Sequence, residues 1–483
     1  MAREKGQRAR ATRIVATIGP NAEKPGALEA LLDAGADVVR LNGAHCRRGE
    51  IARRVALVRR LARARRAPTG VLLDLGGPKI RVGALAGGSA SLVCGQAVEL
   101  FPGRAPAAGP GGAVRLAVTY PALLDDIAPG AEVRLDDGRI SLRVRKRGRR
   151  ALFAAVEVGG RVKSEAGVNF PESALSAPAL TAKDLRDLAE GLEAGVDFVG
   201  LSFVRSPAHV AHLRRLLARV APERRPWVVS KIERKEALAA LDEIGAASDA
   251  LMVARGDLGV EIGLTGVPRA QREILAAGRR HAVPVIVATQ MLESMIENPT
   301  PTRAEVSDVA GAVHDGADAV MLSGETAVGA WPVAAVEAMA EIARAAEEPE
   351  AGFVPEAGPC LLAGDFAAVV ARTAAGMARD AHAAAMVVYT QSGRTARLVS
   401  KNPLSIPVLA FTSLETVRQK LTLLRDVTSF HVPEARSVEA MVRAGDAVLS
   451  RLPDLAGAVV VEISGAAPAA GATNTLRVRR LPR

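Results

Sequence analysis

Aromatic residues and cysteines are scarce in this chain. Phe, Trp and Tyr make up 3% of its 483 residues, and its three cysteines are Cys46, Cys94 and Cys360. Because proteins that bind single-stranded nucleic acids stack the bases on aromatic side chains, the first shortage disfavours that class. Three cysteines far apart in the sequence form neither a disulfide framework nor a zinc-binding pattern. This usage fits a reducing compartment, and we expect the protein to be cytoplasmic.

Long apolar runs are absent as well. The first apolar segment, Ile14–Ile18, ends at Gly19 and Pro20 and is shorter than the core of a secretory signal. No later segment approaches the roughly 18 consecutive apolar residues that cross a membrane. The sequence therefore predicts no membrane partner.

Acidic residues are outnumbered by basic ones. Lys and Arg total 63 against 52 for Asp and Glu, which gives a net charge of +11. The excess lies mainly in three short segments, 3–13, 143–150 and 477–483, and no recognition helix or zinc finger accompanies it. Since a cluster of charge is most often a solvated surface, we expect no nucleic-acid partner.

Eight short segments rich in Val, Ile and Leu recur along the chain, and stretches with helical periodicity separate them. The segments are Ile14–Ile18, Val38–Asn42, Val71–Asp74, Phe198–Phe203, Val228–Ile232, Ala250–Ala254, Pro284–Ala288 and Ala319–Leu322. Buried parallel strands have this near-continuous apolar composition. Eight alternations of strand and helix predict an α/β fold built on a (β/α)8 TIM barrel.

Polar side chains follow these strands at their carboxyl ends, where TIM barrels place their active sites. They are Arg40 and Asn42, Asp74, Ser202 and Arg205, Lys231 and Glu233, Arg255 and Asp257, Thr289 and Gln290, and Ser323 and Glu325. One such residue would usually be a helix cap, but seven consecutive strand ends cannot all be caps. We expect a bowl of cationic and carboxylate groups, suited to an anionic substrate bridged by a metal ion.

Two changes of pattern divide the chain into domains. Between 83 and 178, Gly, Pro and short alternating strands replace the helices, which predicts a small β-barrel lid domain inserted after the third strand. The Glu, Pro and Gly content of 347–359 indicates a linker, and helices and strands alternate again after it. We therefore predict a catalytic barrel from 1–82 and 179–346, a lid from 83–178, and a C-terminal α/β regulatory domain from 360–483.

Seven motifs resemble those of the pyruvate kinase family. They are TRIVATIGP (12–20), VRLN (39–42), SKIE (230–233), MVARGDLG (252–259), ATQMLESM (288–295), PTRAE (301–305) and MLSGETA (321–327). Any one of them alone would be weak, but together they are highly specific and follow the family's domain order over nearly the whole chain. The resemblance implies the glycolytic transfer of a phosphoryl group from phosphoenolpyruvate to ADP, followed by protonation of the enolate to give pyruvate.

The resemblance implies roles in charge neutralisation and proton transfer. A loose phosphoryl-transfer transition state needs positive charge on its equatorial oxygens, which Arg40, Arg81 and Lys231 would supply. Lys231 would also hold the enolate charge. Thr289 would belong to the proton path to the methylene carbon, although a hydroxyl at a strand end can also simply cap the next helix.

The same resemblance implies a divalent metal site. Glu233 and Asp257 would hold Mg²⁺ or Mn²⁺, because carboxylate oxygens are hard ligands and substrate oxygens and water can complete an octahedron. The alternative is that these carboxylates form ion pairs with Lys231 and Arg255 only.

Two further groups of residues match binding positions of the family. Those of the substrate-binding group are Ala254, Arg255, Gly256, Asp257, Thr289 and Ser323. The backbone amides of the first four would receive the substrate carboxylate at a helix N-terminus. Those of the nucleotide-binding group are Pro20, Asn42 and His45, of which His45 can equally be a surface residue.

Departures from the family pattern bear on monovalent cations. The resemblance places a K⁺ region at Asn42, Asp74 and Lys79. One hydroxyl ligand is missing, because Ala44 stands where the family usually has serine, and Lys79 stands where it usually has glutamate. A fixed ammonium charge there would make K⁺ redundant, so we expect no K⁺ requirement. The alternative is that Lys79 turns to solvent.

A loop in the predicted C-terminal domain resembles the family's effector site. Its residues are Thr390, Ser392, Gly393, Arg394 and Thr395. It implies a sugar-phosphate or nucleotide effector, whereas a capped helix start without a ligand explains the same residues. The family resemblance also implies a homotetramer.

A second hypothesis for the whole chain is a paralogue that has lost turnover and senses phosphorylated metabolites. Joint retention of Arg40, Lys231, Glu233, Asp257 and Thr289 favours the enzyme, because a sensor has no need of the proton-path threonine and both metal carboxylates.

Overall fold

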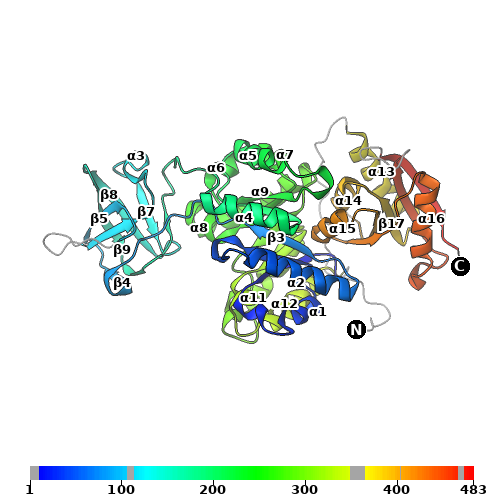
Figure 1. The fold of residues 1–483 in the computed structure, drawn as a ribbon, viewed down its shortest axis with the longest axis horizontal. Helices are drawn as coiled ribbons and strands as arrows, with labels where there is room; N and C mark the ends of the chain where they lie inside the picture. Colours follow the sequence, from blue (N-terminus) through cyan, green and yellow to red (C-terminus); the bar gives the residue numbers. More distant parts are fainter. Residues whose placement is uncertain (1–9, 106–113, 349–364, 403, 466–472, 483) are drawn as a thin grey trace.

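The computed structural model describes residues 10–105, 114–348, 365–402, 404–465 and 473–482. Three bodies lie in a row, with the β-rich insert at one end, a barrel in the middle and the C-terminal domain at the other end (Figure 1). Most of the predicted linker, Cys360 and the first residues of the basic N-terminal segment lie outside the described residues.

The central body is a closed barrel of eight parallel strands, in which each strand pairs with the next and the last closes on the first. The strands are β1 (Arg13–Ile18), β2 (Val38–Asn42), β3 (Gly70–Asp74), β12 (Phe198–Leu201), β13 (Trp227–Ile232), β14 (Ala250–Ala254), β15 (Val285–Ala288) and β16 (Ala319–Leu322). All eight predicted strands are present, and the predicted barrel is confirmed.

Helices surround the barrel. They are α1 (Ala27–Ala34), α2 (Glu50–Arg65), α4 (Ala182–Ala194), α5 (Pro207–Leu217), α6 (Lys235–Ala239), α7 (Leu241–Ala247), α8 (Arg255–Ile262), α9 (Val267–Arg280), α10 (Arg303–His314), α11 (Gly324–Ala327) and α12 (Pro332–Ala346). Thr181 and Thr302 begin α4 and α10 with capping boxes, which satisfy backbone N–H groups of the first turn. The helical segment between β13 and β14 is divided into α6 and α7 at Ala240, whose backbone leaves the helical region.

The barrel core follows the strand composition. Outward-facing side chains such as Val39, Leu41 and Leu73 are fully buried against the helices. Each such burial contributes about 1.5–3 kcal/mol. Inward-facing side chains at the end where the strands begin, including Leu72 and Phe198, form one cluster with the C-terminal domain. Most of the predicted catalytic residues lie at the other end of the barrel.

The insert after β3 is an all-β domain. Its elements are β4 (Ser89–Leu92), β5 (Ala97–Pro102), β6 (Val114–Val118), α3 (Leu123–Asp126), β7 (Glu132–Leu135), β8 (Ile140–Arg147), β9 (Leu152–Val158), β10 (Gly160–Lys163) and β11 (Val168–Asn169). Six strands form one sheet in the order β11-β7-β8-β9-β5-β6, and β10 pairs with β4 in a second sheet. The two sheets share one core rather than a single closed ladder.

The C-terminal domain has a five-stranded sheet in the order β19-β18-β17-β20-β21, of which only β21 is antiparallel to its neighbour. Its elements are α13 (Phe366–Asp380), β17 (Ala385–Tyr389), α14 (Arg394–Ser400), β18 (Val408–Thr412), α15 (Glu415–Lys420), β19 (Val427–His431), α16 (Val438–Leu449), β20 (Val459–Gly465) and β21 (Thr473–Arg480). The sequence pattern did not predict the edge strand β19, because polar residues interrupt its apolar positions.

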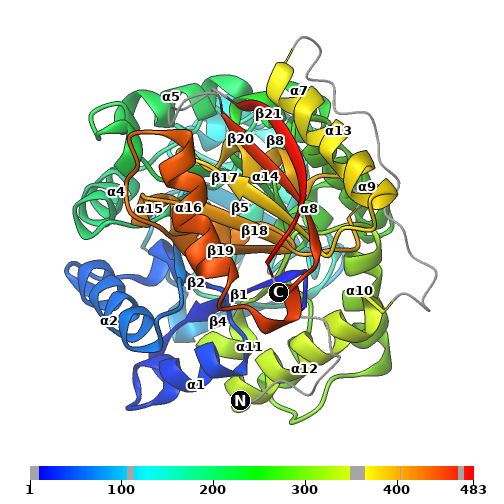
Figure 2. The same cartoon turned by 90° about the vertical axis from the view of Figure 1, so that its right-hand side faces the viewer.

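This domain covers the end of the barrel at which the strands begin (Figure 2). Arg13 Nε donates a hydrogen bond to the Leu424 carbonyl at 2.8 Å, and the Thr69 amide donates to Gln419 Oε1 at 2.8 Å. The carboxyl ends of the strands remain open toward the insert. Among the described helices, none combines the length and the apolar composition needed to cross a membrane.

Candidate active site

A cavity of about 130 Å³ lies at the carboxyl ends of the barrel strands. The residues that line it include most of the predicted catalytic and cation-binding set, namely Arg40, Asn42, His45, Asp74, Lys79, Arg81, Lys231, Glu233, Ala254, Asp257 and Thr289. A cleft of about 450 Å³ lies beside it, between the barrel and the β7–β8 turn of the insert. Side chains far apart in the sequence therefore meet at one end of the barrel, beneath the predicted lid.

A chain of ion pairs connects three strand ends in this cavity. Arg40 Nε donates to Asp74 Oδ2 at 2.8 Å. Lys231 Nζ lies 3.4 Å from Asp74 Oδ1, 2.9 Å from Glu233 Oε1 and 2.8 Å from Ser202 Oγ. These side chains are almost fully buried, so each charge depends on its neighbours for compensation.

The electrostatics of this network keep Asp74 and Lys231 charged. Burial alone would raise the pKa of Asp74, but the positive charges of Lys231 and Arg40 outweigh it and lower that pKa. Burial would lower the pKa of Lys231, but the charges of Asp74 and Glu233 outweigh it and raise that pKa. Lys231 therefore stays protonated throughout the physiological pH range.

The two predicted metal ligands fit a divalent cation. Burial raises the pKa of Glu233, and the nearby negative charge of Asp257 raises it further against the pull of Lys231. A cation between two such carboxylates relieves this repulsion. Among the described residues no cluster of three or more His, Cys, Asp or Glu side chains is arranged as a metal site. The protein thus offers two carboxylates, and the remaining ligands would come from substrate and water.

Thr289 is held in a strained and defined position. Its φ of 68° lies in the left-handed region, which is unusual for a β-branched residue. Its Oγ1 accepts a hydrogen bond from the Gly256 amide at 2.8 Å and donates to the Ala288 carbonyl at 2.6 Å. The hydroxyl therefore joins the end of β15 to the first turn of α8, where the predicted carboxylate-binding amides lie.

The side chain of Arg255 bonds to the backbone that follows β15, a contact that the strand-end pattern did not predict. This side chain does not line the cavity, and its Nη2 donates to the carbonyls of Thr289 and Gln290 at 2.8 and 2.9 Å. Its Nη1 pairs with Asp308 at 2.8 Å. Arg255 is thus a positioning residue that supports the left-handed backbone at Thr289, while binding of substrate by its amide stays a prediction.

The remaining predicted residues lie around the edge of the site. Arg81 Nη1 donates to the Glu165 carbonyl of the insert at 2.8 Å, and Ser323 lines the larger cleft. Partial burial and nearby cations, with Arg81 foremost, lower the pKa of His45. Pro20 is exposed and lines neither the cavity nor the cleft. The nucleotide roles of Pro20 and His45 stay predictions.

Two strand-end residues to which no catalytic or binding role was assigned, Ser202 and Glu325, line the cavity and the cleft respectively. Ser202 Oγ accepts from Lys231 and donates to the Leu75 carbonyl at 2.7 Å. Glu325 is buried and accepts hydrogen bonds from the amides of Ser323 and Leu292, at 2.6 and 3.2 Å. Both residues appear in the strand-end pattern, which could therefore have assigned them a structural role.

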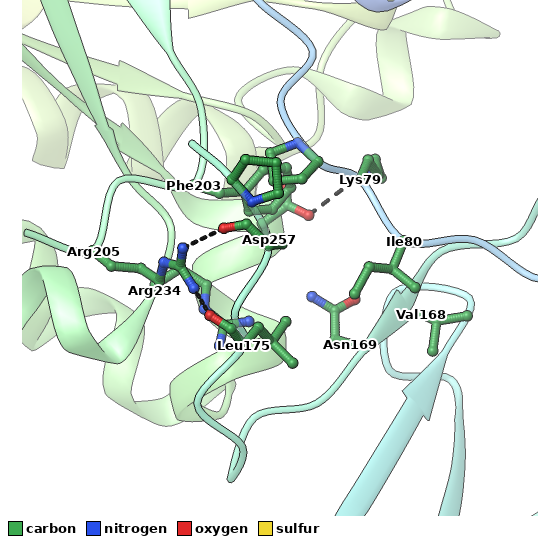
Figure 3. Close-up of a pocket in the computed structure, with 12 residues that line it drawn as sticks. Lys79, Ile80, Val168, Asn169, Leu175, Phe203, Arg205, Arg234 and Asp257 are labelled. Atoms are coloured by element: carbon green, nitrogen blue, oxygen red, sulfur yellow. Dashed lines mark hydrogen bonds and ion pairs between the residues drawn. The ribbon is translucent and has the colours of Figure 1, made fainter. Parts of the chain in front are cut away.

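A narrow cavity of about 40 Å³ lies where the insert joins the barrel (Figure 3). Lys79 and Ile80 line it from the segment that leads into the insert, and Asn169 lines it from β11. Arg205, another strand-end residue, donates hydrogen bonds to the carbonyls of Leu175 and Ala177 on the returning segment. Arg205 therefore holds the returning segment, which forms the hinge of the predicted lid, and it does not line the cavity of the predicted catalytic residues.

A buried ion pair lies behind this hinge. Arg234 Nη1 donates to Glu261 Oε1 at 2.8 Å, and Arg234 Nη2 reaches the Ser173 carbonyl at 3.4 Å and Glu236 Oε1 at 3.2 Å. Burial raises the pKa of Glu261 to about 7, and the charge of Arg234 offsets the effect only in part. The returning segment of the insert is thus tied to a carboxyl group that titrates near neutral pH.

This pair leads to a prediction for stability. The folded-state pKa of Glu261 lies above its usual value of 4.5, so the folded state binds the proton more tightly and stability falls as pH rises from about 4.5 to 7. We expect Glu261→Gln to remove up to about 3 kcal/mol of this decline. Urea denaturation at pH 5 and pH 8 measures the free energy of unfolding of the wild type and the variant, with the exposed Glu273→Gln as control. Equal pH dependence in the Glu261 variant and the wild type would contradict the prediction.

The predicted effector loop lies far from this site, at the barrel end covered by the C-terminal domain. Gly393 has a φ of 83°, and a Cβ there would lie 3.3 Å from the Trp227 ring at the start of β13. Its amide donates to Thr390 Oγ1 at 2.9 Å, and Arg394 forms an ion pair with Asp365. Arg394 is therefore already partnered, and effector binding by this loop stays a prediction.

Comparison with known proteins agrees with this architecture. The family model described as pyruvate kinase, barrel domain, matches residues 9–336, and the pyruvate kinase alpha/beta domain matches 368–479. The pyruvate kinase of Mycobacterium tuberculosis strain H37Rv is 41% identical over 472 residues, which cover 97% of this chain and 98% of that protein. The pyruvate kinase of Methylorubrum extorquens is 38% identical over 478 residues, 98% of each chain.

A solved structure shows the same fold. The crystal structure of a pyruvate kinase from Cryptosporidium parvum superposes with a TM-score of 0.88 at 31% sequence identity, covering 98% of this chain and 96% of that one. The sequence motifs, the barrel with its insert and the full-length similarity agree. This chain belongs to the pyruvate kinase family of phosphotransferases.

Proposed function

We propose that this protein transfers the phosphoryl group of phosphoenolpyruvate to ADP, giving pyruvate and ATP, with Mg²⁺ or Mn²⁺ and without a K⁺ requirement. The observation that carries the proposal is the meeting of Arg40 and Lys231 with the Glu233 and Asp257 carboxylates in one cavity. Phosphoryl transfer relies mainly on positioning and on neutralising charge, and these residues supply both.

Arg40 and Lys231 act first, on the phosphoryl group. Arg40 is fixed by Asp74 and by Thr17 Oγ1, which accepts from its Nη1 at 3.0 Å. A guanidinium held on two sides is preorganised, so little rearrangement is needed when charge develops on the phosphoryl oxygens. Glu233 and Asp257 would hold the divalent metal, which would supply further neutralisation of the charge on the substrate.

Lys231 then holds the enolate. Its ammonium group is kept charged by Asp74 and Glu233, and its burial makes its field stronger than it would be in water. The Thr289 hydroxyl, already bonded to the Gly256 amide and the Ala288 carbonyl, would orient a water that protonates the methylene carbon. A lid that closes over the cleft would exclude other water from the enolate.

The competing hypothesis is a sensor that binds phosphorylated metabolites without turnover. The intact network of Arg40, Asp74, Lys231 and Glu233 favours the enzyme, because a binding protein has no need of a charged lysine between two buried carboxylates. The homotetramer expected from the family remains part of the proposal, as does a phosphorylated effector at the Thr390–Thr395 loop.

The test is an assay of purified protein with phosphoenolpyruvate, ADP and Mg²⁺, in which a coupled dehydrogenase reports pyruvate. We expect pyruvate formation that requires all three components and stops when a chelator removes the divalent metal. Binding of phosphoenolpyruvate without any pyruvate at millimolar substrate would favour the sensor instead.

A further inference from the structure

The end of strand β12 lies beside the end of β13, which carries Lys231 and leads to Glu233. The backbone turns there at Phe203, whose φ of 53° lies in the left-handed region and is unusual for a large side chain. The Phe203 amide donates a hydrogen bond to Glu233 Oε2 at 2.6 Å. The preceding residue, Ser202, has its Oγ 2.8 Å from Lys231 Nζ. Two neighbouring residues at the end of β12 thus contact both charged residues at the end of β13.

The hydroxyl group of Ser202 has a fixed orientation. Its proton goes to the Leu75 carbonyl at 2.7 Å, so its lone pairs are left for Lys231. The Leu75 amide in turn donates to the Gly200 carbonyl at 3.0 Å, which ties the segment after β3 to β12. Ser202 is 2% exposed, and an added Cβ at Gly77, whose φ is 65°, would lie only 2.9 Å from the Ser202 Cβ. Packing and hydrogen bonding therefore hold this hydroxyl as an acceptor at one point.

The other two described partners of the Lys231 ammonium group are carboxylates. Asp74 Oδ1 lies 3.4 Å from Lys231 Nζ, farther than in an ordinary hydrogen bond, and Asp74 Oδ2 accepts from Arg40. Glu233 Oε1 lies 2.9 Å from the same nitrogen. Both carboxylates offset the positive charge of the ammonium group. Ser202 is a neutral partner, so it can fix the position of the ammonium group without adding a negative charge beside it.

We propose that Ser202 is a positioning residue, which holds the Lys231 ammonium group where it acts on the phosphoryl group and the enolate. The proposal rests on the proposed function, in which Lys231 neutralises the charge of both. A lysine carries a compact charge on a long, flexible stem, and electrostatic stabilisation requires that this charge is in place before the reaction begins. Without the Ser202 hydroxyl, we expect the ammonium group to shift toward Glu233, the nearer of its two carboxylates.

The first test compares kcat and the KM for phosphoenolpyruvate in the wild type, Ser202→Ala and Ser202→Cys, at saturating ADP and Mg²⁺. Alanine removes the hydroxyl and leaves a gap, whereas cysteine fills the space with a thiol that is only a weak acceptor. We expect both variants to lower kcat about 10- to 100-fold, because a small misplacement of a catalytic group has effects of this size. The KM should change less than about threefold, since the lost interaction strengthens only in the transition state.

Ser230→Ala is the matched control. Ser230 is fully buried in β13 directly before Lys231, its Oγ lies 2.7 Å from Ser248 Oγ, and it does not line the cavity. This variant also removes a buried serine hydroxyl, but it leaves the contact between Ser202 and Lys231 in place. Its kcat should therefore stay within about twofold of the wild-type value.

The second test does not depend on turnover. Crystal structures of the wild type and Ser202→Ala locate Lys231 Nζ directly. We expect this atom to lie within hydrogen-bond distance of Ser202 Oγ in the wild type. In Ser202→Ala it should move toward Glu233 Oε1 or occupy more than one position. If the wild type forms no pyruvate, the proposed function fails, and this comparison still decides whether Ser202 positions Lys231.

Four results would overturn the proposal. The first is a wild-type kcat in Ser202→Ala, and the second is an unmoved Lys231 Nζ in the crystal structure of that variant. The third is a wild-type kcat in Ser202→Cys, which would mean that the site needs a filled space and not a hydrogen-bond acceptor. The fourth is an equal loss of kcat in Ser230→Ala, which would mean that the loss of any buried hydroxyl near this strand lowers the rate.

Discussion

Replacing Lys231 with Met is expected to reduce pyruvate formation by roughly a thousandfold or more. Lys231 is placed to neutralise both the transferred phosphoryl group and the enolate, and the described side chains nearest to its Nζ are acidic or hydroxyl groups. Without it, charge develops in the transition state beside two carboxylates and no ammonium. The loss should therefore appear in kcat, because the interaction strengthens only as the reaction proceeds.

Loss of folding must be separated from loss of chemistry in this test. Removing Lys231 leaves Asp74 and Glu233 buried without their shared cation, which costs about 3–5 kcal/mol. Lys231→Arg keeps the positive charge and should stay close to wild-type stability, but its planar fork cannot reproduce a compact ammonium at the same point. We expect the Arg variant to be folded and to bind phosphoenolpyruvate, with turnover far below wild type. Wild-type turnover in the Met variant would remove Lys231 from the mechanism.

The barrel could be predicted because burial of its strands on both faces determines their apolar composition. Segments such as Ala250–Ala254 are buried on both faces, so all their side chains are apolar, and the first polar residue marks the end of the strand. Lys231 and Asp257 lie among the polar residues at or just after the ends of such strands. The rule failed at β19, where an edge strand of the C-terminal sheet is only partly buried and its polar residues hide the apolar pattern.

Side-chain contacts between segments far apart in the sequence could not be predicted in the same way. The strand-end rule identifies Arg255 but not the direction of its side chain, which depends on Asp308 and on the left-handed backbone at Thr289. Glu261 is one charged residue of a helix until the fold places Arg234 against it.

The second large effect concerns K⁺. We expect similar rates in K⁺, Na⁺ and tetramethylammonium at matched ionic strength. Lys79 lines the same cavity as Asn42 and Asp74, and its Nζ lies 3.8 Å from Asp257 Oδ1. We therefore expect its ammonium to provide a fixed charge where the family pattern would place a mobile cation.

The oxygens that would hold K⁺ are also already engaged. Asp74 Oδ2 accepts from Arg40, and Asp74 Oδ1 faces Lys231. Asn42 Oδ1 accepts from the Ala44 amide at 3.3 Å, and Ala44 provides no hydroxyl. A monovalent cation would have to compete with fixed positive charges for the same oxygens, so it gains little by binding.

Lys79→Glu replaces one of these fixed positive charges with a negative charge. Removing one fixed cation and adding a carboxylate should lower the rate roughly a hundredfold or more in tetramethylammonium, because charge on the phosphoryl oxygens is less well neutralised. K⁺ should then restore part of the rate, since the new carboxylate supplies an oxygen ligand, although the missing hydroxyl at Ala44 limits recovery. Lys146→Glu, the same charge change on an exposed lid strand, controls for a general effect of charge. Strong activation of the wild type by K⁺ would show that the Lys79 ammonium does not substitute for the ion. An unchanged rate in Lys79→Glu would show that this side chain does not act on the reacting groups, although it lines the cavity.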